Sequence, residues 1–305
     1  MINARTVLLI VLAAMSLLFA VRWLGAVAAR RRHRDGSVEM RAPGLVHLAV
    51  GFVTNFFDTL GIGSFATTTT AYKVLRLVPD ERIPGTMIVG HALPATGQAL
   101  IFIAVVNVDS TLLLSMVAAS VVGGWLGAGI VSRLPRRPIQ VGMGVALLAA
   151  ALFMAMSQLG WFPSGGAARG LPLPGLVLAV SLNFVLGALL MLGIGNYGPC
   201  LVLLSLLGMD PRAAFPIMMS TGALVITVGG LKFMNTGRYD VRAALGLALG
   251  GIPAVLIAGL IVKSLPLGAL RWLVVAVVTY AAVVMLRSAR SADAQPLTDF
   301  QAVQS

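Results

Sequence analysis

Two apolar segments of this chain are interrupted by the same short glycine motif. The first runs from Gly51 to Val78 and carries Asp58, Gly61 and Gly63 near its middle. A glycine inside a helix costs roughly 1 kcal/mol relative to alanine, and an ionisable group at bilayer depth costs about 2.5 kcal/mol or more. The segment is therefore predicted to be a broken helix rather than a continuous membrane-spanning one.

The motif returns later in the chain, together with its surroundings. Gly61-Ile62-Gly63 recurs as Gly193-Ile194-Gly195, an offset of 132 residues. The same offset carries four further residues onto identical ones, namely Pro79 to Pro211, Pro84 to Pro216, Met87 to Met219 and Gly97 to Gly229. We interpret this register as two copies of one unit, each opening with a broken helix, a pattern that points to a transporter binding site.

Composition places these units in a membrane. Hydrophobic residues make up 58% of the chain and charged residues only 10%, whereas soluble domains carry about 25% charged residues. The net charge of +12 comes from arginines at the ends of apolar segments, where they set orientation and contact membrane lipid, so no nucleic-acid partner is predicted. The single cysteine, Cys200, excludes an internal disulfide, and no metal-type cysteine spacing occurs.

The predicted fold is an all-α polytopic membrane protein with two inverted repeats. Each repeat is expected to contain a re-entrant broken-helix hairpin plus three transmembrane helices, and one extra N-terminal transmembrane helix precedes them. The expected parts are 1–42 (extra helix at 6–28 and a basic cytoplasmic loop), 43–158 (first repeat), 159–175 (linker), 176–290 (second repeat) and 291–305 (polar tail). Broken segments are expected at 45–77 and 176–207, and crossings at 84–106, 111–132, 138–158, 214–234, 241–262 and 268–286.

The arginine distribution favours re-entry over crossing for the broken segments. If both segments are re-entrant, fifteen basic residues at segment ends face the cytoplasm and five face outside; if both cross, the division is eleven to nine. Because cytoplasmic loops are enriched in Lys and Arg, re-entry fits better. It also places the N-terminus outside, the C-terminus in the cytoplasm, and two oppositely oriented hairpin tips near the midplane of the cell membrane.

The tips are the expected anion site. The second arm of each hairpin begins near Ser64 or Asn196, so free backbone N–H groups and the positive end of a helix dipole face the cavity. Predicted substrate-binding residues are Gly61, Gly63, Ser64, Thr67, Thr68, Gly193, Gly195, Asn196, Ser220 and Thr221. The hydroxyls of Thr69 and Thr70 are expected to bond back to their own helix.

Four ionisable or amide residues near the tips are candidates for coupling or gating: Asp58, His91, Gln98 and Lys232. Asp58 has the wrong sign for an anion ligand, so it is either paired, with Lys73 as one partner, or used for proton coupling. His91 is equally compatible with proton relay and with a structural hydrogen-bonded role. For Lys232 the alternatives are snorkelling to the interface and a ligand or counter-ion role.

The motifs together resemble the sulfite exporter TauE/SafE family, also called toluene sulfonate uptake permeases. The matching pieces are FFDTLGIGSF and its threonines, the run from Pro79 to His91, and GIGNYGPCLVLLSLLGMDPRAAF followed by MMSTGALVITVGGLKF. The resemblance covers about residues 44–287. It implies a duplicated membrane fold that moves small anions such as sulfite, sulfonates, or related organosulfur or carboxylate compounds.

The sequence thus predicts a permease for a small anion, without enzymatic activity, cofactor or bound metal; a homo-oligomer is compatible with it. One alternative is a cation or metal carrier using Asp58 and His91, against which stands the lack of further acidic residues at depth. Another is an intramembrane enzyme using Ser64 and His91, which leaves the symmetry of the two tips unexplained.

Overall fold

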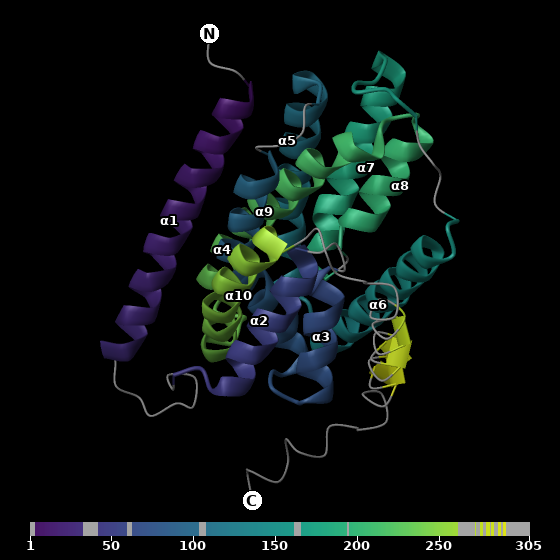
Figure 1. The fold of residues 1–305 in the computed structure, drawn as a ribbon. Coiled ribbons are helices and arrows are strands. Elements are labelled where there is room, and N and C mark those ends of the chain that lie inside the picture. Colours follow the sequence, from purple (N-terminus) through teal and green to yellow (C-terminus); the bar gives the residue numbers. More distant parts are fainter. Residues whose placement is uncertain are drawn as a thin grey trace, which may run out of the picture.

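The computed structural model describes residues 4–32, 42–59, 63–103, 108–161, 166–193, 195–261 and parts of 272–290. Within these ranges the chain is helical, and its only extended pairing is an isolated bridge between Ala168 and Met209 (Figure 1). The elements are α1 (Ala4–Arg32), α2 (Leu45–Thr59), α3 (Ser64–Val74), η2 (Asp80–Arg82), α4 (Ile83–Ile103), α5 (Ser110–Val131), α6 (Arg136–Gln158), α7 (Leu173–Leu190), α8 (Tyr197–Leu206), α9 (Pro211–Thr236) and α10 (Val241–Ile261).

Six of the described helices are long and apolar enough to cross a membrane: α1, α5, α6, α7, α9 and α10. The sequence also predicted a crossing at 84–106, where α4 lies. This helix is not among the six, and it carries Thr86, His91, Thr96 and Gln98. These four side chains are buried, so α4 is a polar central helix of the bundle.

Both apolar segments break at the glycine motif, as predicted. The first break separates α2 from α3 and the second separates α7 from α8. Gly63 and Gly193 adopt φ values of 89° and 91°, which other residues rarely accept. Gly61, Ile62 and Ile194 lie outside the described residues.

Each broken segment folds back on itself as a helical hairpin. The Tyr72 hydroxyl at the end of α3 donates to the Ala243 carbonyl (3.2 Å), and the Arg242 Nε donates to the Ala42 carbonyl just before α2 (3.0 Å). The start of α2 and the end of α3 therefore meet at the start of α10. In the second hairpin, the Asp210 N–H beyond α8 donates to the Ala168 carbonyl ahead of α7 (2.8 Å).

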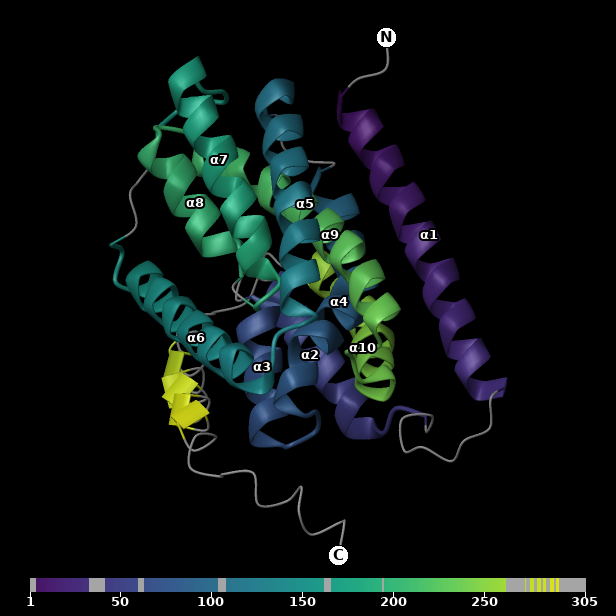
Figure 2. The same ribbon diagram turned by 180° about the vertical axis from the view of Figure 1, so that it is seen from behind.

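The two hairpins start from opposite ends of the molecule. Helix α9 begins beside the open end of the α7–α8 hairpin. After α9 ends, the Asp240 N–H donates to the Thr86 hydroxyl (2.9 Å) at the open end of the α2–α3 hairpin. Figures 1 and 2 show α2 and α3 side by side in the lower half and α7 and α8 side by side in the upper half.

Helices from the two halves of the chain interlock through glycine-lined contacts. Helix α5 packs on α7, and α10, which follows α5 by the 132-residue offset, packs on α2. A Cβ atom on Gly51 would lie 2.4 Å from the Gly246 carbonyl oxygen, and one on Gly123 would lie 2.0 Å from that of Phe184. These backbones approach closely because small residues line the contacts.

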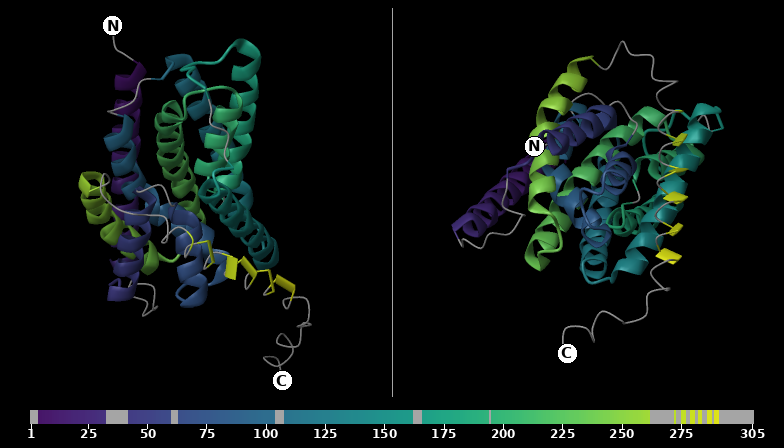
Figure 3. Two further views of the ribbon diagram at one scale, coloured as in Figure 1. Left: turned by 45° about the vertical axis from the view of Figure 1, so that its right-hand side comes forward. Right: turned by 90° about the horizontal axis from the view of Figure 1, so that it is seen from below.

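Helix α1 lies at one edge of the bundle (Figure 3). One of its faces is buried against α9 and α4, and the other is exposed and apolar. The buried face consists of Leu8, Leu12, Ser16, Phe19, Trp23 and Val27, spaced three or four residues apart. The hydroxyls of Ser16 and Thr96 form a hydrogen bond of 2.7 Å, which fixes α1 against the central helix.

Candidate functional site

Asp58 caps the second arm of the first hairpin. Its Oδ1 accepts the backbone N–H of Ser64 (2.7 Å), the first residue of α3, and its Oδ2 accepts the Nε2–H of Gln98 (2.9 Å) from α4. The carboxyl group is buried, with 5% of the residue exposed. The Ser64 amide that the sequence assigned to a substrate anion is therefore held by the protein's own carboxylate in this conformation.

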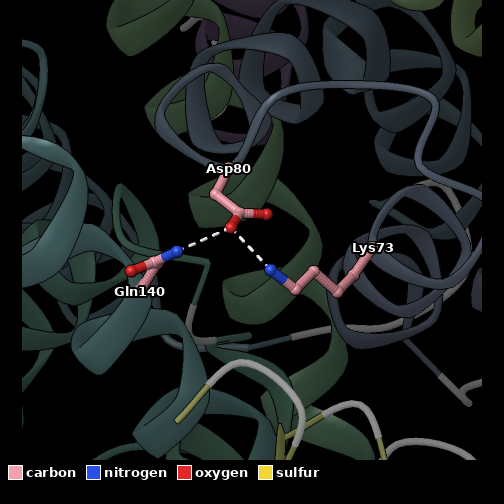
Figure 4. Close-up of polar contacts among 3 residues, drawn as sticks. All are labelled: Lys73, Asp80 and Gln140. Atoms are coloured by element: carbon pink, nitrogen blue, oxygen red, sulfur yellow. Dashed lines mark hydrogen bonds and ion pairs between the residues drawn. The ribbon is translucent and has the colours of Figure 1, made fainter. Parts of the chain in front are cut away.

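Lys73 is not the partner of Asp58, so that expectation is wrong. The Lys73 Nζ instead donates to Asp80 Oδ2 (2.5 Å), which also accepts the Nε2–H of Gln140 (2.7 Å) (Figure 4). The reason is helical geometry, because α3 carries Lys73 to the open end of the hairpin while Asp58 stays at the break. The three side chains tie α3 and η2 to α6.

His91 joins all three helices of the first site. Its Nδ1 lies 2.9 Å from Asn55 Oδ1 on α2, and its Nε2 lies 2.9 Å from the Thr68 hydroxyl on α3. Asn55 uses its Nδ2 on the Gly51 carbonyl (2.7 Å), so its Oδ1 can only accept. The neutral ring therefore carries its proton on Nδ1 and accepts the Thr68 hydroxyl at Nε2.

The hydroxyls of the threonines after the first break have hydrogen-bond partners that differ from the predicted ones. Thr67 donates its hydroxyl to the carbonyls of Gly63 and Ser64 (3.0 Å each), the internal bonding that was expected for Thr69 and Thr70. Thr69 donates to the Met87 sulfur instead (3.1 Å). Thr70 Oγ1 is buried and has no partner within the described ranges.

Fewer polar groups are hydrogen-bonded at the second break than at the first. Asn196 is the residue before α8, but its side chain makes no capping bond, and its Nδ2 is buried without a partner among the described residues. A Cβ on Gly195 would meet no atom within 4 Å, and the same holds for Gly63, its counterpart 132 residues earlier. Both breaks therefore border space that the described residues leave open.

Methionines connect the two breaks. A Cβ on Gly193 would lie 3.3 Å from the Cε of Met87 and 3.6 Å from the Cε of Met143. Met87 also accepts the hydroxyl of Thr69 from α3. The second break and the second arm of the first hairpin therefore contact the same side chain of α4.

Three other predicted site residues, Ser220, Thr221 and Lys232, form no hydrogen bond with either break among the described residues. Ser220 donates to the Pro216 carbonyl of its own helix (2.6 Å), and Thr221 accepts a long bond from Asn183 Nδ2 (3.5 Å); both are fully buried. The Lys232 Nζ donates to the Trp125 carbonyl (3.0 Å) and lies 4.0 Å from the centre of the Trp125 ring. Lys232 thus packs on α5 rather than on either hairpin tip.

Several residues that were not predicted as site residues take part in these contacts: Asn55, Met87, Met143 and Asn183. One signal could have found the two asparagines. Helix α2 carries Gly51 and Asn55 where α7 carries Asn183 and Gly187, so glycine and asparagine exchange places between the units. Across the described residues, no group of three His, Cys, Asp or Glu side chains could hold a metal ion.

The sequence of this chain was compared with models of known protein families. The family model described as "Sulfite exporter TauE/SafE" matches residues 1–154, half of the chain. The chain belongs to this family. The TauE/SafE match includes α1 as well as most of the first unit, whereas the sequence motifs had placed the resemblance at about 44–287.

Membership of the TauE/SafE family, together with the six apolar helices, makes this a multi-pass membrane protein of a transporter family rather than an enzyme. A search of curated proteins and a search of solved structures gave no match.

Proposed function

We propose that this protein is a secondary transporter that moves a small sulfur-containing anion, such as sulfite or a sulfonate, across the cytoplasmic membrane. The observation that carries the proposal is the pair of helix breaks at Gly63 and Gly195, each bordering space that the described residues leave open. In membrane proteins, irregular backbone at depth is tolerated where it is buried in protein or lines a water-filled cavity.

The proposed topology has two inverted repeats with re-entrant hairpins. It is supported by the opposite directions of the hairpins and by the positions of the arginines. Arg76, Arg82, Arg238 and Arg242 lie at the open end of the α2–α3 hairpin, whereas Arg169 lies at the other end, where its carbonyl accepts the Asp109 N–H. The arginine-rich end is assigned to the cytoplasm, with the N-terminus outside and the C-terminus inside.

In this proposal the anion binds first at the start of α8. The Asn196 Nδ2 and the first N–H groups of α8 supply donors there, and the helix dipole favours a negative charge. At the facing tip, Asp58 already places a carboxylate on Ser64. Two negative charges near one site disfavour each other, so binding of the anion favours uptake of a proton by Asp58, with Gln98 holding the side chain in place.

The test is uptake of labelled sulfite by proteoliposomes containing a Gly195→Leu variant. The matched control is Gly25→Leu on the exposed face of α1, because a Cβ at Gly25 likewise meets no atom within 4 Å. Both proteins should fold, since neither position has a positive φ. Uptake should be lost only in Gly195→Leu, which fills the space at the break; equal uptake by both variants would refute the site.

A further inference from the structure

Lys232, near the end of α9, carries a positive charge that no acidic side chain pairs with among the described residues. Its Nζ reaches across to α5, where it donates to the Trp125 carbonyl (3.0 Å) and lies 4.0 Å from the centre of the Trp125 ring. An ammonium group has three N–H donors and no acceptor. One backbone carbonyl and a ring face therefore leave it able to bind an anion.

A glycine of α5 makes room for this amine. A Cβ atom on Gly129 would lie 2.6 Å from the Lys232 Nζ and 3.1 Å from its Cε. Gly129 follows Trp125 by four residues, so both lie on one face of α5. The ammonium group is therefore held against the backbone of α5, whereas a lysine that only snorkels to the interface needs no such contact.

The depth of Lys232 matches the level of lipid headgroups. Helix α9 has 26 residues, so it is about 39 Å long at 1.5 Å per residue, whereas the hydrocarbon core of a bilayer is about 30 Å thick. Lys232 lies four residues before the end of α9 at Thr236, which is about 6 Å. It therefore lies close to the boundary between acyl chains and headgroups, at the arginine-rich end.

The surface around the amine is apolar and exposed, as expected of a face that contacts lipid. Trp125 is 50% exposed and Ile130, on the next turn of α5, is 64% exposed. Tryptophan is enriched where acyl chains meet headgroups, because its ring is apolar and its N–H is polar. The chain lies in a membrane, so the molecule that covers this surface is a lipid.

A second cation, Arg22 of α1, lies at the same level. Helices α1 and α9 both run toward the arginine-rich end (Figure 1) and are in contact. A Cβ on Gly230 would lie 2.6 Å from the Phe19 ring, so Phe19 faces Gly230. Arg22 follows Phe19 by three residues, and Lys232 follows Gly230 by two. Arg22 is exposed and has no hydrogen-bond or ion-pair partner in the described ranges.

Helical geometry places Arg22 on the side of α1 that faces α5. Residues three apart are displaced by about 60° around a helix, so Ser16, Phe19 and Arg22 point in successive directions. Ser16 bonds to α4 and Phe19 contacts α9. Helices α4 and α5 both pack on α9 but not on each other, and α1 contacts all three. The next direction therefore leads to α5, which Figure 2 shows beside α9 and α1.

We propose that Lys232 and Arg22 bind the phosphate of an anionic phospholipid, with Trp125 packing against its glycerol and upper acyl chains. Basic residues between membrane helices favour such headgroups electrostatically. A zwitterionic lipid carries its own cation beside the phosphate, which two unpaired basic residues would repel. This lipid site goes beyond the proposed function, since it requires only that the chain lies in a membrane.

Lipid binding by the purified full chain in detergent tests the proposal. Native mass spectrometry measures the affinities for phosphatidylglycerol and for phosphatidylcholine with the same acyl chains. The variants are Lys232→Gln and Arg22→Gln, and the control is Arg76→Gln. Arg76 is an exposed arginine at the same end of the molecule, just past α3, which packs on α2, α4 and α6 rather than on this surface.

A basic residue beside an anionic lipid contributes about fivefold in affinity. Lys232→Gln and Arg22→Gln should therefore each weaken phosphatidylglycerol binding by about fivefold and leave phosphatidylcholine binding unchanged, while Arg76→Gln binds both lipids like the parent. Parent-level phosphatidylglycerol binding by Lys232→Gln, or an equal loss in Arg76→Gln, would overturn the lipid site. Displacement of the lipid by excess inorganic phosphate would also overturn it, by showing a site for free phosphate.

A charge-preserving variant separates electrostatics from packing. Lys232→Arg should bind phosphatidylglycerol like the parent, because a guanidinium group also stacks on tryptophan; a loss equal to that of Lys232→Gln would overturn the role of the charge. Should Lys232→Gln fail to fold, Arg22→Gln decides, since Arg22 is exposed. The readout is lipid binding, so a negative result would overturn the lipid site and leave the proposed transport site standing.

Discussion

At the scale of single residues, Asp58 occupies the helix end that a substrate anion would otherwise meet. Its two oxygens accept N–H groups from Ser64 and Gln98, and no basic side chain pairs with it among the described residues. A carboxylate in this position can respond to a neighbouring anion by taking up a proton. In the proposed function, Asp58 thereby connects the hydrogen bonds of the first break to proton-coupled transport.

This role predicts a specific defect in Asp58→Asn. The asparagine oxygen can still accept the Ser64 N–H, so α3 keeps its cap, but the side chain can no longer carry a proton. Exchange of labelled for unlabelled sulfite should persist, whereas accumulation driven by a proton gradient should fall by about tenfold or more, the cost of about 1.4 kcal/mol of lost coupling. Asp109→Asn, which alters the cap of α5, is the control; proton-driven accumulation by Asp58→Asn at the parent level would contradict the coupling role.

At the scale of elements, α6 links the two hairpins. It contacts both α3 and α8, and one of its turns carries Gln140, bonded to Asp80, and Met143, packed at Gly193. The Lys73–Asp80 pair therefore fixes the end of the first hairpin to the helix that also touches the second break (Figure 4). A movement of one hairpin is expected to displace the other hairpin through this helix.

The buried pair at this junction makes a prediction about stability. Lys73→Met or Asp80→Asn alone removes one partner of this largely buried ion pair, which costs up to about 3–5 kcal/mol, so either variant should unfold at lower temperature in detergent. The double variant removes both charges and should lose less than the sum of the two single losses. Strictly additive losses would show that the two residues do not act as a pair.

The sequence predicted the elements better than it predicted their side-chain contacts. The glycine breaks and the offset of 132 located the arms of both hairpins, because helix interruption and apolar length are local properties. The partner of Asp58 was missed, since Lys73 is carried away from the break by two and a half turns of α3. The hydrogen bonding of Asn183 could not be predicted either, because its amide donates to the Met116 carbonyl on another helix.

At the scale of the whole molecule, the two halves form one interlocked body. Each half supplies the helix that packs on the first hairpin arm of the other, α5 on α7 and α10 on α2, while α4 packs on α9 between them. The side chain of Met87 on α4 accepts the Thr69 hydroxyl of α3 and lies beside Gly193 at the second break, so it contacts elements of both halves. We propose, as a consequence, that a single anion is shared by both hairpin tips.

That consequence can be measured directly by protecting one cysteine at each tip. Ser64→Cys and Gly195→Cys, each in the Cys200→Ala background, are labelled by the membrane-impermeant anion 2-sulfonatoethyl methanethiosulfonate at increasing concentrations of methanesulfonate. A shared anion should protect both cysteines with half-effective concentrations within about threefold of each other, less than 1 kcal/mol apart. Protection at one tip alone, or at widely different concentrations, would contradict a shared site.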